Sequence, residues 1–239
     1  MDGSGFIEGI DVSKWQAEVN WQRVRAAGKQ FAFARVSDGL HFQDAWFDGN
    51  WSGMGRVGLF RGAYQMFRAG QDPEQQAELL VRKVGTLGPG DLPPVLDLEL
   101  TDGQPVDVVI KKALRWLAVV EQQLGHVPVV YTAHYFWKQL GYPEGFDGYP
   151  LWVANYDVSK PRLPPGWSRW SFWQYSQSGH VPGINGNVDL DRFSGTLSDL
   201  KELARGYPSA RPAPSAPAPS APTLSVPTPS ELAPSLPTV

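Results

Sequence analysis

The sequence predicts an α/β fold in which eight strands form an incomplete (β/α) barrel, followed by a tail that has no fold of its own. Three observations support this prediction. Eight short apolar, β-rich runs are spaced along residues 5–206, helical spacing of apolar residues follows each of the first five, and the composition changes abruptly after residue 206. Alternating strands and helices predict a mainly parallel sheet, and eight strands are enough to close a barrel.

The predicted elements follow one another in a regular order. Strands are expected over residues 9–12, 31–36, 59–67, 94–98, 127–132, 151–154, 171–175 and 188–190. Helices are expected over 21–27, 44–54, 73–84, 106–124 and 134–140, so that five strand–helix units precede three bare strands. A doubly wound open sheet is the alternative, but the G-x-G-x-x-G segment at 53–58 precedes a strand instead of following one and is not a phosphate loop.

The chain divides into one domain, residues 1–206, and a disordered tail, residues 207–239. Ten of the 22 prolines fall in this tail, whereas all ten tryptophans precede it. A segment of Pro, Ala and Ser cannot bury a core and favours extended polyproline conformations. Three interpretations stay open: a plain tail, a linker to a further domain, or a ligand for an unknown proline-binding partner.

The overall composition excludes several classes of partner. With 21 basic and 24 acidic residues, the formal net charge is −3, which offers no electrostatic footprint for nucleic acid. No run is long and apolar enough for a membrane helix, and the absence of cysteine removes thiolate nucleophiles and Cys-based metal sites. The first residues lack the features of a secretory signal, so we expect the protein to stay in the cytoplasm until it is released or exported by another route. We also expect it to be a monomer.

Two acids on one predicted strand are the strongest chemical signal. Asp97 and Glu99 lie two residues apart, so their side chains project to the same face of the strand. Like charges held together at an apolar strand end raise each other's proton affinity, which is what a general acid requires. Asp11 and Asp189 are predicted at the same rim. The alternative is that these acids pair with a nearby Arg or cap a helix.

Polar and aromatic residues end the other strands, where a (β/α) barrel places its chemistry. The candidates for binding substrate are Arg35, Tyr64, Tyr131, Trp152, Tyr156 and Gln174. The flat ring of Trp152 is a candidate for stacking on a sugar. Trp21, Trp46 and Trp116 have inward-facing helical spacing, so we expect them in the core.

Paired carboxylates beside aromatic rings are typical of sites that break glycosidic bonds. The four histidines are scattered and form no H-E-x-x-H pair, and no G-x-S-x-G elbow is present. We therefore expect a glycosidase that needs neither a cofactor nor a metal ion.

Six motifs occur in order along the domain: G-I-D-V-S-K-W-Q at 9–16, G-A-Y at 62–64, D-L-E at 97–99, L-W-V-A-N-Y at 151–156, F-W-Q-Y at 172–175 and V-D-L-D at 188–191. The ordered set resembles glycoside hydrolase family 25, the Chalaropsis-type lysozymes. The resemblance implies a flattened, TIM-like (β/α)5β3 barrel. It also implies hydrolysis of the β-1,4 bond between N-acetylmuramic acid and N-acetylglucosamine in peptidoglycan.

The resemblance assigns roles to matching residues. Glu99 matches the family's general acid, Asp97 its partner in the D-x-E pair, and Asp11 and Asp189 two further acids of the cleft. Tyr64, Trp152 and Tyr156 match aromatic positions near the sugar. The second catalytic role stays open: Asp97 could orient the substrate's own acetamido group as nucleophile, which we favour, or Asp189 or Asp11 could act as nucleophile or base.

The chain departs from the family pattern at three places. Gln65 replaces a common His on the third strand, Arg35 and Asp38 stand in a segment that usually carries Lys and Glu, and Asp191 replaces a usual Asn. None of these touches the D-x-E pair.

We expect a phage-type endolysin acting on peptidoglycan glycan strands, with a non-catalytic cell-wall-binding or virion structural module as the alternative.

Overall fold

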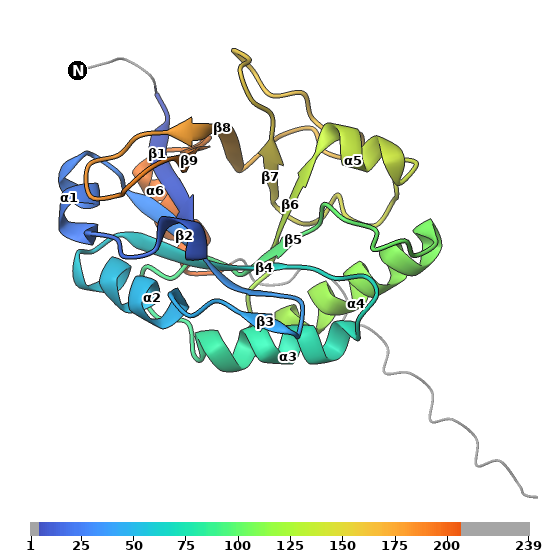
Figure 1. The fold of residues 1–239 in the computed structure, drawn as a ribbon. Helices are drawn as coiled ribbons and strands as arrows, with labels where there is room; N and C mark the ends of the chain where they lie inside the picture. Colours follow the sequence, from blue (N-terminus) through green and yellow to red (C-terminus); the bar gives the residue numbers. More distant parts are fainter. Residues whose placement is uncertain (1–4, 207–239) are drawn as a thin grey trace, which may run out of the picture.

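The computed structural model describes residues 5–206, and the tail expected at 207–239 lies outside the described residues. The described part is a closed barrel with helices packed around it (Figure 1). Its strands are β1 (Ile7–Val12), β2 (Phe31–Asp38), β3 (Phe42–Gln43), β4 (Phe60–Met66), β5 (Val95–Asp97), β6 (Val129–Ala133), β7 (Leu151–Ala154), β8 (Phe172–Gly179) and β9 (Val188–Phe193). Its helices are the short 3-10 helix η1 (Lys14–Gln16), α1 (Trp21–Ala26), α2 (Phe47–Arg56), α3 (Pro73–Val84), α4 (Val106–Leu124), α5 (His134–Gln139) and α6 (Leu197–Ala204).

Hydrogen bonding around the sheet closes the barrel. The strands follow the order β1-β9-β8-β7-β6-β5-β4-β2, and β1 also pairs with β2 to complete the ring. Neighbouring strands of this ring are parallel except at β9, which runs antiparallel to both β1 and β8. The predicted barrel of five strand–helix units and three bare strands is confirmed, with β3 and α6 as additions.

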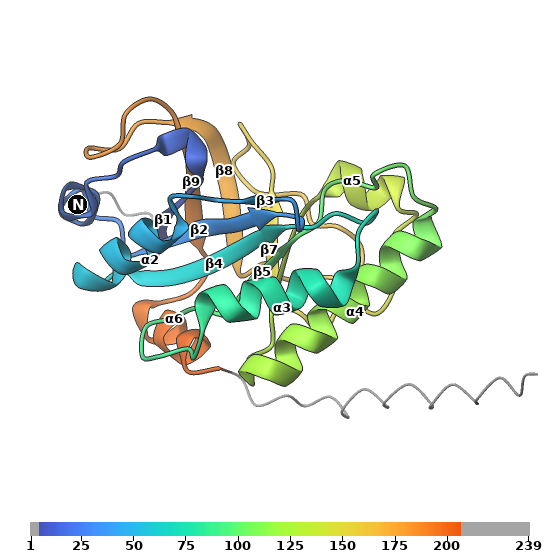
Figure 2. The same ribbon diagram turned by 60° about the horizontal axis from the view of Figure 1, so that its bottom comes forward.

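Helices cover one side of the barrel more fully than the other. The pair α3 and α4 lies side by side against β4 and β5, and α2 packs on β2 and β4 (Figure 2). None of the helices within residues 5–206 has the length and apolar composition to cross a membrane. The side formed by β7, β8 and β9 has no helix between its strands, which leaves this side of the barrel to loops.

The added helix α6 closes the amino-terminal end of the barrel. Leu200 and Leu203 of α6 pack in one buried cluster with Phe31 and Phe172, the first residues of β2 and β8. The helix begins with a capping box in which Thr196 and Asp199 bond each other's backbone N–H groups. The spacing of Thr196 and Asp199 is a local signal for the start of a helix, but α6 was not predicted from the sequence.

The barrel interior changes from aromatic to polar toward the carboxyl ends of its strands. Every second strand residue faces inward, so β2 contributes Phe31 and Phe33 to the interior cluster and Arg35 to the end of the barrel. The large rings fit because neighbouring strands carry glycine: a Cβ atom at Gly9 would overlap Phe31, and one at Gly62 would overlap Phe33. The polar end is where the predicted acids converge.

The predictions for the helical tryptophans are mostly confirmed. Trp21 and Trp116 are buried, whereas Trp46 is 39% exposed, so its predicted place in the core was wrong. The helix predicted from residue 44 begins at Phe47, and Trp46 is its N-cap, ahead of the turns that face the barrel. Asp44 instead accepts hydrogen bonds from the backbone N–H groups of Lys14 and Trp46.

Candidate active site

A cavity of about 210 Å³ opens at the carboxyl ends of the barrel strands. It brings together nine of the ten residues predicted for the site: Asp11, Arg35, Tyr64, Asp97, Glu99, Tyr131, Trp152, Gln174 and Asp189. The tenth, Tyr156, does not line the cavity but donates a hydrogen bond from its hydroxyl to Oε1 of Gln174 over 2.6 Å. Ser13, Trp15 and Met66 complete the lining and were not predicted.

Asp97 is buried at the carboxyl end of β5 and has no partner for one of its oxygens. Its Oδ1 atom is shielded from solvent and has no hydrogen-bond donor among the described residues. Burial raises the pKa of Asp97 well above its ordinary value, the charge of Glu99 raises it further, and Arg35 opposes both. Asp97 is therefore a carboxyl group with an oxygen free to accept a hydrogen bond from a ligand.

Glu99 lies two residues beyond the end of β5 and is half-buried. Burial is the largest cause of its raised pKa, Asp189 and Asp38 add to it, and Arg68 opposes it. The sequence predicted that the two acids raise each other's proton affinity, whereas desolvation is the largest cause of the raised pKa of Glu99. A carboxyl group that keeps its proton toward neutral pH beside a cavity can act as a general acid.

Arg68, which lowers the pKa of Glu99, does not neutralise this pair by direct contact. Arg68 binds Asp38 with two guanidinium nitrogens and Asp102 with the third, at 3.0 Å from Nη1 to Oδ1. Among residues 5–206, neither Asp97 nor Glu99 forms an ion pair. The alternative of simple salt bridges for these two acids therefore does not describe this structure.

Arg35 is held against the cavity wall by Asp44. Its Nε donates to Oδ2 of Asp44 over 3.1 Å, and its Nη2 lies 3.0 Å from the same oxygen. Because Asp44 also holds the backbone of Lys14 and Trp46, this carboxylate joins η1, β2 and the start of α2. Asp44 was predicted as the start of a helix and not as a residue of the site, whereas α2 begins at Phe47.

Gln174 links three elements at the other side of the cavity. Its Oε1 accepts hydrogen bonds from the hydroxyls of Tyr131, over 2.8 Å, and Tyr156, over 2.6 Å. With two donors on the oxygen, the amide NH₂ faces Asp11 and donates to its Oδ2 over 2.7 Å. The network fixes the position of the Asp11 carboxyl.

The acids on β1 and β9 lie close together, and burial raises their pKa values. Asp11 lies opposite Asp189 in the β1–β9 register. Burial raises the pKa of Asp11 well above its ordinary value, with Asp189 and Asp191 as further causes. Burial also raises the pKa of Asp189 to about 6.

Two tryptophans contact the cavity in different ways. Trp152 is 2% exposed, and its ring stacks on Phe33 with centroids 4.5 Å apart, so it forms wall and presents little free face. Trp15, on η1, is 75% exposed and still lines the cavity. The D-V-S-K-W-Q motif that contains Trp15 was noticed in the sequence, but no role was assigned to its tryptophan.

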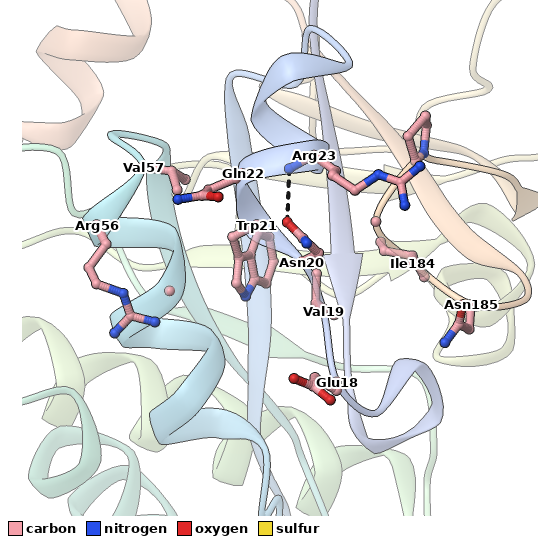
Figure 3. Close-up of a pocket in the computed structure, with 13 residues that line it drawn as sticks. Glu18, Val19, Asn20, Trp21, Gln22, Arg23, Arg56, Val57, Ile184 and Asn185 are labelled. Atoms are coloured by element: carbon pink, nitrogen blue, oxygen red, sulfur yellow. Dashed lines mark hydrogen bonds between the residues drawn. The ribbon is translucent and has the colours of Figure 1, made fainter.

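A larger concavity of about 920 Å³ lies elsewhere on the barrel, between the start of α1, the end of α2 and the loop that joins β8 to β9 (Figure 3). Arg23 and Arg56 stand on opposite sides of Trp21 there. Glu18 is the acidic residue of its described lining, so it has no pair of carboxylates. Of these two cavities, the smaller one holds the paired acids Asp97 and Glu99.

Comparisons with known proteins agree with the geometry. A family model described as glycosyl hydrolases family 25 matches residues 10–184, a range that holds Asp11, Asp97 and Glu99 and ends before Asp189. The chain is 37% identical over 213 residues to the protein YegX of Escherichia coli strain K12, covering 86% of this chain and 76% of that protein. It is 33% identical over 214 residues to lysozyme M1 of Streptomyces globisporus, covering 85% of this chain and 72% of that protein. The crystal structure of the bacterial lysozyme from Streptomyces coelicolor matches with a TM-score of 0.81 at 33% identity, covering 85% of this chain and 98% of that chain.

Proposed function

Because the chain belongs to glycosyl hydrolase family 25 and is a glycoside hydrolase of the lysozyme type, we propose a specific bond for its action on peptidoglycan. This is the β-1,4 bond between N-acetylmuramic acid and N-acetylglucosamine. The observation that carries the proposal is the half-buried carboxyl of Glu99, which lines the cavity beside the buried Asp97 and whose pKa is raised by burial. We assign to Glu99 the role of general acid, which protonates the leaving glycosidic oxygen.

Asp97 assists the departure of that oxygen by holding the substrate's 2-acetamido group, which attacks the anomeric carbon. Its buried Oδ1 has no donor among the described residues, so it can accept the N–H of the substrate's 2-acetamido group. Held in this way, the acetamido oxygen attacks the anomeric carbon and closes an oxazolinium ring as the glycosidic C–O bond breaks, and Glu99 gives its proton to the leaving oxygen. Water then adds to the anomeric carbon and opens the ring, and its proton returns to Glu99. The alternatives are Asp189, half-buried on β9, or Asp11 as nucleophile or as base for water.

The remaining residues of the cavity bind the sugar. We assign to Arg35, Tyr64, Tyr131 and Gln174 polar contacts along the wall, and to Tyr156 the support of Gln174. Because Phe33 covers one face of Trp152, we assign sugar stacking at the cavity mouth to the exposed ring of Trp15 and assign to Trp152 a place in the cavity wall.

Identification of the new chain ends tests the proposal. Purified peptidoglycan is digested with the wild-type chain and with Glu99→Gln, reduced with borohydride and analysed by mass spectrometry. We expect reduced muramic acid ends from the wild type and a rate at least about 100-fold lower for Glu99→Gln, because the amide has no proton to give. Glu202→Gln, an exposed change on α6, is the matched control.

Other results would redirect the assignment. Reduced glucosamine ends would place the cleavage at the other glycosidic bond. Sedimentation with the wall without new ends would instead favour the non-catalytic binding module. A loss under threefold for Glu99→Gln would remove Glu99 from the acid role.

We further propose that the activity serves bacterial lysis of the phage endolysin type. Cutting glycan strands removes the covalent support of the wall against internal pressure, so access to the wall should be sufficient for lysis. Expression in a bacterial host together with a pore-forming membrane protein should clear the culture for the wild type and not for Glu99→Gln. An intact culture whose extract still cleaves peptidoglycan would contradict the lytic role.

A further inference from the structure

A fully buried acid, Asp191, lies beside the cavity without lining it. Its Oδ1 atom accepts a hydrogen bond from Nε1 of Trp152 over 2.9 Å. Its Oδ2 atom is shielded from solvent and has no donor among the described residues. An ionised oxygen left in this condition is strongly unfavourable, so Asp191 either carries a proton or shares one with a neighbour.

The charged groups around Asp191 identify that neighbour. On its own strand it is close to Asp189, on β1 it is within hydrogen-bonding reach of Asp11, and Lys29, just before β2, is the cation that acts on it. Lys29 is engaged elsewhere, because its Nζ lies 3.4 Å from Oε2 of Glu8. Of the two carboxyl groups near Asp191, Asp189 acts on it through its charge, whereas Asp11 is the one within hydrogen-bonding reach.

Two carboxyl groups in contact away from water cannot both be ionised. A single proton between them changes the repulsion into a short, charge-assisted hydrogen bond. Gln174 donates to Oδ2 of Asp11, so the other oxygen of Asp11 can take part in this bond, and Asp189 also lies within hydrogen-bonding reach of Asp11. The pair then carries one negative charge in total.

We propose that Asp191 and Asp11 share one proton at neutral pH and that Asp191 thereby acts as a positioning residue, holding the Asp11 carboxyl with one oxygen and the Trp152 indole with the other. Both residues held in this way line the cavity. The single remaining negative charge of the pair faces the substrate through Asp11, where it stabilises positive charge that develops on the sugar ring. The catalytic consequence rests on the proposed function, whereas the shared proton does not.

Protonation is measured directly on the wild-type chain by carboxyl carbon NMR, with labelled aspartate and with Asp191→Asn to assign the signals. We expect the Asp11–Asp191 pair to bind one proton at pH 7, and the Asp11 signal of Asp191→Asn to move toward that of an ionised carboxylate. Two ionised carboxyls at pH 7 in the wild type would overturn the proposal. This readout needs no activity, so a shared proton in a chain that cleaves no peptidoglycan would refute the proposed function and leave the pairing intact.

Activity tests the positioning role by comparing two replacements of Asp191. Asp191→Asn keeps an acceptor for Trp152 and offers a permanent N–H to Asp11, so we expect it to retain kcat/KM within about threefold. Asp191→Leu removes both bonds, and we expect a loss of at least about tenfold, mainly in kcat, in a chain whose near-ultraviolet circular dichroism is unchanged. An Asn variant as impaired as a folded Leu variant, or a Leu variant with wild-type kcat, would contradict the positioning role.

Discussion

The side-chain amide of Gln174 donates to Oδ2 of Asp11 over 2.7 Å and so joins two strands that lie 163 residues apart in the chain. The same amide accepts from two tyrosine hydroxyls, which leaves it a single orientation. The position of Asp11 in the cavity is therefore set by a residue from the opposite end of the domain. The predictions below test this and three other relationships.

Replacing Gln174 with Met should lower the free energy of unfolding by about 1–3 kcal/mol. The substitution leaves the hydroxyls of Tyr131 and Tyr156 without their acceptor and removes a hydrogen-bond donor from Asp11. Tyr156→Phe is the milder comparison, because it removes one of the two donors to Oε1 and leaves the bond to Asp11. Urea unfolding at pH 7 measures both. A Met variant as stable as the wild type would show that the network contributes nothing to the fold.

Removing the charge of Arg68 should move the alkaline limb of the pH–kcat/KM profile to higher pH. Arg68 lowers the pKa of Glu99, so Arg68→Met lets the general acid keep its proton at higher pH. Arg82→Met, on the exposed face of α3, is the matched control. An alkaline limb that stays in place or moves to lower pH would separate Glu99 from the titration that controls the rate.

The substitution Trp15→Ala should weaken substrate binding without affecting the fold. The ring is 75% exposed, so its loss leaves the core intact, whereas loss of stacking on a sugar should raise KM roughly two- to tenfold with little change in kcat. Trp46→Ala, a second exposed tryptophan that does not line the cavity, should leave KM unchanged. Equal effects of the two substitutions on KM would argue against a stacking role.

Asp189 should make the protein less stable as the pH rises from about 4 to about 6. Its pKa is raised in the folded state to about 6, so the folded chain binds the proton more tightly than the unfolded chain does. The stabilisation is complete below the unfolded pKa and is lost as the pH passes the folded pKa. Asp189→Asn should therefore be more stable than the wild type at pH 7, by up to about 3 kcal/mol, relative to the difference between them at pH 4.

Chemical denaturation at several pH values measures this difference. The gap between Asp189→Asn and the wild type should widen from pH 4 to pH 7. A gap that is constant with pH would show that Asp189 titrates alike in the folded and unfolded chains.

Local patterns in the sequence determined the strands, the five crossover helices and the converging acids. The spacing of Asp97 and Glu99 predicted that both side chains face one way, and both line the cavity, although β5 ends at Asp97 and Glu99 lies beyond the strand. Because parallel strands present their carboxyl ends at the same edge of a barrel, Asp11, Arg35 and Gln174 could be expected near them before any contact was known.

Tertiary structure alone decided how these side chains are held and which faces stay free. The burial of Trp152 against Phe33, the hydrogen bond from Arg35 to Asp44 and the oxygen of Asp191 without a donor among the described residues all depend on which strands close the ring. Closure brings residues from distant segments within about 3 Å, and hydrogen bonds at that range depend on packing that no local period encodes. The sequence therefore predicted the acids and the barrel, whereas the partners that set the charge and orientation of each acid came from the packed fold.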